Sequence, residues 1–321
     1  MWLEELGESL NTIDYERSHP HGQLKSLIQG AKGKVFPDPF GYRGALPTDE
    51  EPWESVDPEL NYKETRIIAV DGSQIYPDPA EPLPWGYAHA MVTDPPGEYL
   101  SEFLRPGELL RARAARGRKY VDNVRFSLEL HLAASVAVKK GEGVVVLLDG
   151  PILPPGRTLP SREGTGKDYL DQALIALDDA TDRGGVIAGF TPNGHASYIS
   201  NLLLAMVEED NRERQIPLID RKVIKSLINP TQRTALYKRI ALDGREVYFF
   251  YTRQGRVEFP FQPSQEVINQ VWGCVRKGYP AELTAAHHLA VIPNGTASYL
   301  KAIMRSNLDE AVTEKRIAKH K

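Results

Sequence analysis

Two long apolar runs dominate the pattern of hydrophobic and polar positions in this chain. They cover residues 67–70 and 144–148, and an Asp-Gly pair follows each of them. Four or five apolar residues without a polar interruption are typical of central strands that are covered on both faces. We therefore predict two buried strands, each leaving the sheet at its aspartate, Asp71 in the first and Asp149 in the second.

Shorter patterns predict the elements around these two strands. Segments 85–93 and 98–104 are predicted strands, and their short links to the first buried strand predict an antiparallel meander. A long helical region follows at about 107–140. The remaining predicted elements are helices at 168–181, 196–209, 264–277 and 281–290, a strand at 186–190, a hairpin of 245–253 and 256–261, and a charged helix at the end of the chain.

The order of these elements, β-β-β-α-β-α at its beginning, predicts an α/β fold with a mixed sheet and helical additions. Residues 1–60 are poor in strand signals. We interpret them as an N-terminal extension packed on a main domain of residues 61–321.

Composition and charge narrow the class of protein. The 321 residues are 41% hydrophobic and 26% charged, as in a globular protein with a substantial core. A net charge of -4 excludes a globally basic nucleic-acid binder but not a local basic groove. The single cysteine excludes an intrachain disulfide and a cysteine-based zinc site. The first residues do not resemble a signal peptide, and no stretch approaches the roughly 18 apolar residues that span a membrane, so we expect a cytoplasmic protein.

The aspartates after the two apolar runs are the first candidates for chemistry. For either one alone a tight turn is an equally good explanation, because Asp-Gly favours such turns. As a pair on neighbouring strands, Asp71 and Asp149 are suited to bind a hard cation.

Glu129, in the middle of the long helical region, is a third candidate. Its helical face is mostly apolar and consists of Arg125, Phe126, Leu132, Ala133 and Val136. A carboxylate pointing inward is costly unless it is paired or binds a metal, and a salt bridge to Arg125 is the alternative explanation. Together with the two aspartates, Glu129 would form an acid cluster of the kind that binds two cations in phosphodiester hydrolysis.

Basic residues gather in the first half of the same helical region. The segment 111–119 has five basic residues and no acid, which suits a track for a phosphate backbone. A solvated charged face is an equally good explanation of this segment alone. The candidate DNA-binding arginines are Arg111, Arg113, Arg116, Arg118 and Arg125.

Two adjacent histidines, His287 and His288, lie in the predicted helix at 281–290. Neutral imidazole is a common ligand of manganese-class ions. Only one of two adjacent residues can face a given site, and the sequence leaves open which one does.

With these residues in place, the sequence resembles the NurA nuclease family of archaea and bacteria. The matching stretches are Ile68-Ala-Val-Asp-Gly-Ser73, Glu129 in its helix, Leu147-Leu-Asp-Gly150 and Tyr279-Pro-x-x-Leu-x-x-Ala-His287. Their order and spacing match the family pattern from about residue 65 to 290. The resemblance implies a ribonuclease-H-like core and metal-dependent cleavage of DNA, as a 5′-to-3′ exonuclease with some single-strand endonuclease activity.

The resemblance also implies roles for individual residues. The metal ligands carry over to Asp71, Glu129, Asp149 and His287, and a tyrosine near the active site carries over to Tyr279. Ser73 of the Asp-Gly-Ser motif is assigned to DNA binding. We further expect Gly72 to let a cation or phosphate approach the backbone, because it has no side chain.

The implied cofactor is manganese, with magnesium as the alternative, and we expect two ions. The implied partners are DNA, a second copy of the chain, and a hexameric HerA-type ATPase that acts with the nuclease in DNA end resection for recombination repair. Segment 164–167 resembles a phosphate loop but lacks its first glycine, and Asp168 replaces the Ser or Thr that binds magnesium, so ATP would be the task of the partner.

One departure and two alternatives remain. Many relatives carry a lysine close to the position of Gly189, whereas this chain has Thr191-Pro-Asn-Gly194 nearby; Arg221 or Lys225 would have to replace any phosphate contact made there. An RNA-directed nuclease on the same core is the alternative enzyme, because an acid cluster does not distinguish the sugar. A catalytically idle subunit that binds DNA or docks on the ATPase is the alternative of a different class.

Overall fold

The structure of the protein is a computed structural model. It describes residues 44–48, 53–55, 66–78, 80, 84–94, 98–105, 109, 117–141, 143–153, 167–192, 194–207, 219–241, 243–276 and 278–319. The chain forms two compact units, and it passes between them more than once. The first unit contains 1–65, 150–152 and 188–280, and the second contains 66–149, 153–187 and 281–321.

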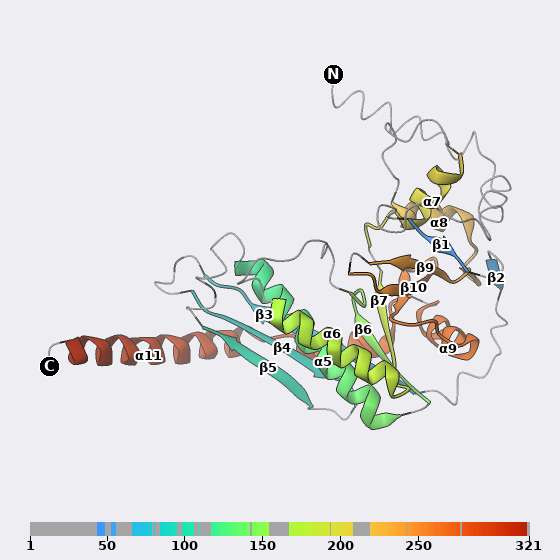
Figure 1. Cartoon of the computed structure of the whole chain (residues 1–321). Helices are drawn as coiled ribbons and strands as arrows, with labels where there is room; N and C mark the ends of the chain where they lie inside the picture. The colour runs from blue at the N-terminus through green and yellow to red at the C-terminus, as the bar shows by residue number, and fades with distance from the viewer. Residues whose placement is uncertain are drawn as a thin grey trace, which may run out of the picture. The chain divides into compact units, whose positions relative to one another are not determined.

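The second unit is built on a mixed sheet with the strand order β7-β6-β3-β4-β5 (Figure 1). Its strands are β3 (Arg66–Ile75), β4 (Gly86–Val92), β5 (Tyr99–Leu104), β6 (Val144–Asp149) and the beginning of β7 (Val186–Thr191). The first three form an antiparallel meander, and β6 pairs with β3 in parallel. This arrangement confirms the predicted mixed sheet and the predicted β-β-β-α-β-α order of its first elements.

Strand β3 is longer than predicted, and the prediction that it ends at Asp71 is wrong. Its parallel pairing with β6 extends to Val70, but its antiparallel pairing with β4 continues from Val70 to Ile75. The backbone beyond Asp71 therefore still finds hydrogen-bond partners in β4, and it stays extended. The alternative of a tight turn at Asp71 is excluded.

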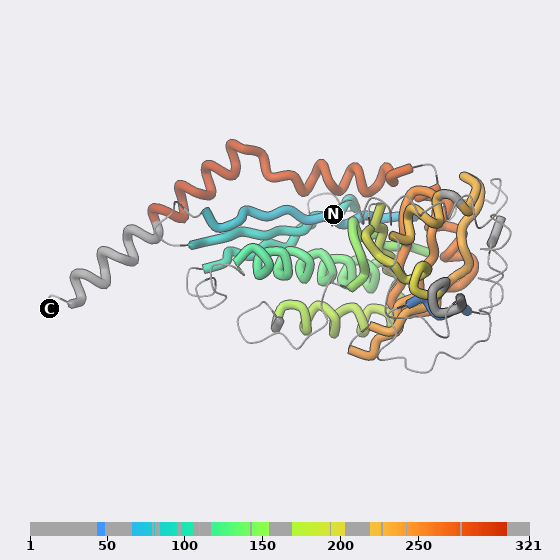
Figure 2. The backbone as a smooth tube through the Cα atoms, turned by 90° about the horizontal axis from the view of Figure 1, so that it is seen from above, coloured from blue at the N-terminus to red at the C-terminus, as the bar shows by residue number. Residues whose placement is uncertain are grey.

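Helices cover both faces of this sheet. On one face α5 (Gly117–Lys140) packs against β3, β4 and α6 (Lys167–Asp182), and it buries Ala88 of β4 together with Val121 and Val124. The other face receives α10 (Ala281–Ala290), which is followed by α11 (Asn294–Lys319). Figure 2 shows α5 and α6 on one side of the strands and the last two helices on the other. Within the described ranges, no helix is long and apolar enough to cross a membrane.

The strands of the first unit follow the order β1-β9-β10-β11-β7, and two further strands, β2 and β8, form a separate pair. The hairpin predicted around residues 254–255 is confirmed by β10 (Glu246–Tyr251) and β11 (Arg256–Phe259), which pair in antiparallel orientation. Its other elements are β1 (Leu46–Pro47), β2 (Trp53–Ser55), β8 (Gln232–Thr234), β9 (Tyr237–Ile240), α7 (Tyr198–Val207), α8 (Asp220–Leu227) and α9 (Gln265–Val275).

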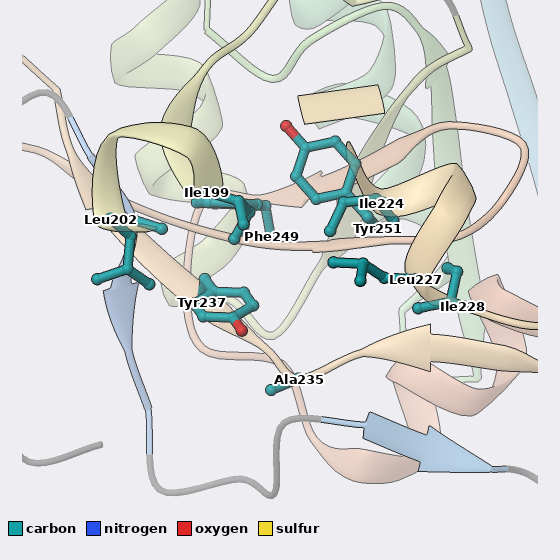
Figure 3. Close-up of a cluster of buried hydrophobic side chains, with 10 residues drawn as sticks. Ile199, Leu202, Ile224, Leu227, Ile228, Ala235, Tyr237, Phe249 and Tyr251 are labelled. Atoms are coloured by element: carbon teal, nitrogen blue, oxygen red, sulfur yellow. The ribbon is translucent and has the colours of Figure 1, made fainter. Parts of the chain in front are cut away.

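A cluster of buried apolar side chains forms the core around α7, α8 and the strands β9 and β10 (Figure 3). Its members include Ile199, Leu202, Ile224, Tyr237 and Phe249. A buried carboxylate, Asp220, joins the two helices, because it accepts hydrogen bonds from the first backbone N–H groups of α7 and from the Tyr251 hydroxyl. The first N–H groups of a helix have no partner within the helix, and Asp220 provides partners for two of them in α7.

A second buried carboxylate, Glu258 of β11, is held by two arginines. Its Oε1 lies 3.2 Å from Nη2 of Arg239 and 3.1 Å from Nε of Arg256, and its Oε2 accepts the backbone N–H of Ile152. Burial alone would raise the pKa of Glu258, but Arg256 and Arg239, together with the N–H group, bring it below its ordinary value. The folded state therefore prefers the ionised carboxylate.

We expect Glu258→Gln to lower the free energy of unfolding by about 3–5 kcal/mol, because it leaves two buried guanidinium groups without their counter-charge. The matched control is Glu246→Gln, which breaks an exposed pair with Lys238 and should cost about 1 kcal/mol or less. Urea unfolding measures both values. The pKa of Glu258 is lower in the folded state than its ordinary value of 4.5. The loss in free energy of unfolding caused by Glu258→Gln should therefore be largest above pH 4.5 and become smaller as the pH falls below this value. Equal losses in the two variants would contradict this assignment.

Candidate metal centre

The parallel register of β3 and β6 places two aspartates side by side. The paired residues run from Arg66 with Val144 to Val70 with Leu148. The next residue on each strand is Asp71 or Asp149. Neighbouring strands lie only about 4.8 Å apart, so the pairing brings the two carboxylates to one place.

Helix α10 adds a histidine to the pair. The helix packs on the sheet through Leu283, Ala286 and Ala290, and His287 stands at the flank of this buried face. Its Nδ1 atom lies 2.9 Å from Oδ2 of Asp71. One ligand atom from each of Asp71, Asp149 and His287 lies within 4.8 Å of the other two.

The neighbouring His288 is exposed, and its ring centroid is 6.3 Å from that of His287. The group of potential ligand atoms contains His287 and not His288. Of the two adjacent histidines, His287 is therefore the one that faces the aspartates.

Glu129 approaches the aspartates from the α5 side of the sheet, and Gly72 makes room for it. Successive residues of a strand point to opposite faces, so Gly72 faces α5 while Asp71 faces α10. A Cβ atom on Gly72 would lie 2.6 Å from Oε1 of Glu129 and 2.6 Å from the carbonyl oxygen of His89. The missing side chain thus accommodates a protein carboxylate, which is a different reason from the one we expected.

Burial raises the pKa of Glu129 to about 8. The Arg125 guanidinium, which forms an ion pair with Glu129, opposes the shift, whereas the carboxylates of Asp71 and Asp149 add to it. The three acids therefore act on one another electrostatically. A carboxylate in such a place is stabilised by positive charge, from a side chain or from a metal ion.

The other predicted residues have different surroundings. Tyr279 belongs to the first unit, where its ring lies 6.1 Å from that of Phe190. Ser73 is half-buried on β3, opposite His89 of β4. Arg118 is an exposed residue in the first turn of α5, and its guanidinium lies 5.4 Å from the centre of the Tyr76 ring.

Three of the predicted DNA-binding arginines, Arg111, Arg113 and Arg116, lie outside the described residues. Arg221 and Lys225, considered as substitutes for a lysine near Gly189, are exposed on α8 in the first unit.

Sequence patterns did not reveal His89, which fastens α10 to the sheet. Its Nε2 lies 2.6 Å from the carbonyl oxygen of Ala290, in the last turn of α10, and its Nδ1 lies 3.4 Å from the Tyr87 hydroxyl. A carbonyl oxygen only accepts, so Nε2 carries the hydrogen. The contact joins residues about two hundred positions apart, and no local signal in the sequence announces it.

The donor set fits a manganese-class ion. Two carboxylates and one imidazole are ligands that such ions accept, and Asp71 is only 4% exposed, so its charge calls for compensation. The His287 side chain is 59% exposed, which leaves an open approach for a substrate.

The sequence and the structure were compared with known protein families, curated proteins and solved structures. A family model described as the NurA domain matches residues 65–292, a range that contains all the acids and the histidine of the candidate centre. No curated protein matches the sequence. Among solved structures, the catalytic domain of human endonuclease V, in a cysteine-substituted form, is similar at 12% identity and a TM-score of 0.30, covering 94% of this chain and 98% of that chain.

We expect Gly72→Ala to disrupt the centre. The added methyl group would meet Glu129 and the His89 carbonyl at distances that real Cβ atoms do not show, so β3 or α5 must shift. Overpacking of this kind costs about 1–3 kcal/mol of stability, and manganese affinity should fall with it. Gly295→Ala on α11 is the control, because nothing lies within 4 Å of its added Cβ. Urea unfolding and isothermal titration with manganese measure both effects, and a Gly72→Ala protein that matches wild type in both would refute this reason for the glycine.

We expect His89→Leu to lower manganese affinity about 10- to 100-fold, as loss of an outer partner of a metal site typically does. The variant loses the N–H group that holds the end of α10, and with it the position of His287. His89→Gln keeps an N–H donor at a similar reach and should recover part of the affinity. Electron paramagnetic resonance, which distinguishes free from bound manganese, measures the affinity of each variant. Unchanged affinity in His89→Leu would show that α10 is held by its apolar face alone.

Proposed function

The chain belongs to the NurA domain family, and we propose that it is a metal-dependent nuclease that cleaves DNA. The family confirms the resemblance inferred from the sequence. The observation that carries the proposal is the convergence of Asp71, Asp149 and His287, whose ligand atoms lie within 4.8 Å of one another. Acid clusters that bind divalent ions are a recurring solution for phosphodiester hydrolysis.

In this proposal Asp71, Asp149 and His287 hold manganese, with magnesium as the alternative, and Glu129 completes the acidic site. Bound there, a divalent cation lowers the pKa of a water molecule and stabilises the leaving oxygen. The protein supplies the rigid placement. Asp71 is fixed by strand pairing on β3 and by a hydrogen bond from the Gly72 N–H to its Oδ1, and His287 is fixed by α10. Such preorganisation spares the site from rearranging during the reaction.

Substrate contacts extend from this centre along β3 and α5. Ser73 follows Asp71 by two residues on the same strand face, so its hydroxyl stands about 7 Å further along and can meet an adjacent phosphate. Arg118 is exposed at the start of α5, and Arg111, Arg113 and Arg116 precede it in the chain. We assign these arginines to the phosphate backbone and Tyr279 to the substrate at the active site.

The finer function that we propose is the one implied by the resemblance to the family. We propose a 5′-to-3′ exonuclease with single-strand endonuclease activity that acts as a homodimer in double-strand-break end resection, together with a hexameric HerA-type ATPase. The sequence supports this division of labour, because its one phosphate-loop-like segment, 164–167, departs from the motif.

Cleavage of matched DNA and RNA strands by Asp71→Asn and Asp149→Asn tests the proposal. Each change removes a direct ligand, so manganese-dependent DNA cleavage should fall by more than the roughly 10- to 100-fold typical of an outer partner. Asp179→Asn on α6 is the control: it breaks an exposed pair with Arg183, just after the helix, and should cleave like wild type. Chelation should abolish cleavage, and added manganese should restore it.

Other results would point to other functions. Cleavage of RNA alone would identify an RNA-directed nuclease. Salt-dependent DNA binding without any metal-stimulated cleavage would identify an idle binding or docking subunit. Full activity in Asp71→Asn would refute the metal centre as the site of the reaction.

A further inference from the structure

The chain passes from the second unit to the first directly after Asp149. Asp149 is the last residue of β6, and the parallel pairing of β6 with β3 ends one residue earlier, at Leu148. Asp71, by contrast, lies within β3, where the pairing with β4 continues to Ile75. The position of Asp149 therefore depends more than that of Asp71 on the backbone that comes after it.

Strand β7 provides two contacts to the turn of residues 150–152 that follows Asp149. The backbone N–H of Gly150 donates to the carbonyl oxygen of Phe190 over 2.9 Å. The turn also lies against Gly189, where an added Cβ atom would be 2.5 Å from the carbonyl oxygen of Gly150. Gly150 has a φ of 142°, which residues with a side chain rarely adopt, so the turn has one specific shape.

Glu258 of β11 provides the third contact to this turn. Its Oε2 accepts the backbone N–H of Ile152 over 3.1 Å, and both residues are buried. Arg239 and Arg256 pair with Oε1 of Glu258, and a hydrogen bond to an ionised acceptor is roughly twice as strong as one between neutral groups. The two guanidinium groups lie 5.1 Å and 5.2 Å from the centre of the Tyr198 ring, which helps to fix the cluster in place.

We propose that Glu258 is a positioning residue for the candidate metal centre: through the N–H of Ile152 it holds the turn after Asp149, and so fixes the direction in which the Asp149 carboxylate points. Peptide units are planar and leave only two soft dihedral angles per residue, so a turn that is held at its first and third residues restricts the residue before it. The buried ion cluster of the first unit thereby acts on metal binding in the second unit. The inference rests on the proposed function, because it requires that Asp149 binds the ion.

Gly189→Ala tests the turn without changing the ion cluster. The added methyl group must push the turn away from β7, so manganese affinity, measured by isothermal titration without DNA, should fall about 10- to 100-fold. The manganese concentration for half-maximal DNA cleavage should rise by the same factor, while KM for DNA changes little. Gly185→Ala is the matched control, because its Cβ atom would be 2.8 Å from the carbonyl oxygen of Ala180, similarly crowded but away from the turn. It should lose stability in urea unfolding and bind manganese like wild type.

Two substitutions within the ion cluster separate positioning from stability. Glu258→Leu removes the acceptor of the Ile152 N–H, so it should lower both stability and manganese affinity, the latter about 10- to 100-fold. Arg239→Met removes one counter-charge but leaves the Glu258 carboxylate, its hydrogen bond to Ile152 and its pair with Arg256. It should lower stability and keep the manganese affinity of wild type. A merely structural role of Glu258 would instead leave the affinity of the folded protein unchanged in both variants.

Wild-type manganese affinity in Gly189→Ala or in folded Glu258→Leu would overturn the inference. An equal loss of affinity in Gly185→Ala or Arg239→Met would also overturn it, because affinity would then follow stability and not the turn. If Glu258→Leu does not fold, the comparison of the two glycine variants decides. A wild-type protein that binds no manganese would refute the metal centre and this inference with it, whereas manganese binding without DNA cleavage would refute only the proposed nuclease activity, so these failures are distinguishable.

Discussion

The parallel pairing of β3 with β6 is the constraint on which the candidate centre depends. It is a match of two apolar strands, Ile67 with Val145 up to Val70 with Leu148, and it leaves the next residues, Asp71 and Asp149, side by side. A slip of one residue would turn one of the two carboxylates to the opposite face of the sheet. The apolar core that fixes the register therefore also fixes the distance between the two carboxylates of the candidate metal centre.

The two faces of β3 then receive different parts of the centre. Asp71 meets α10 and its histidine on one face, whereas Gly72 meets α5 with Glu129 and Arg125 on the other. Only a glycine allows α5 to bring a carboxylate this close to the strand. Because β3 continues as a paired strand beyond Asp71, the ligand sits on a rigid element, and sites built on strands hold their geometry better than sites on loops.

Local patterns were enough for the long elements of the second unit and for the acids, because apolar runs and helical periodicity act over neighbouring residues. They were not enough where the partner is remote. The pairing with β4 that carries β3 past Asp71, and the contact of His89 with the end of α10, depend on residues far away in the chain. In the first unit, β1, β2, β8 and β9 have only two to four residues each, too few to show alternation. Neither periodicity nor spacing distinguished His287 from His288 as the histidine that faces the aspartates. The packing of α10 on the sheet decides this, because it brings His287 to Asp71.

The acid cluster is costly to the fold, and the structure shows how that cost is limited. Asp71 and Glu129 are each only 4% exposed. Asp71 has His287 as its partner, a residue that can be protonated, and Glu129 is paired with the positively charged Arg125. Repulsion among buried carboxylates is thereby reduced before any metal arrives. A cation that enters such a place gains from charges already fixed in position, and its binding free energy adds to the stability of the folded state. In the proposed metal centre, the carboxylates brought together in the folding step would thus be the source of affinity for an ion, because the protein has already fixed the ligands that such an ion needs.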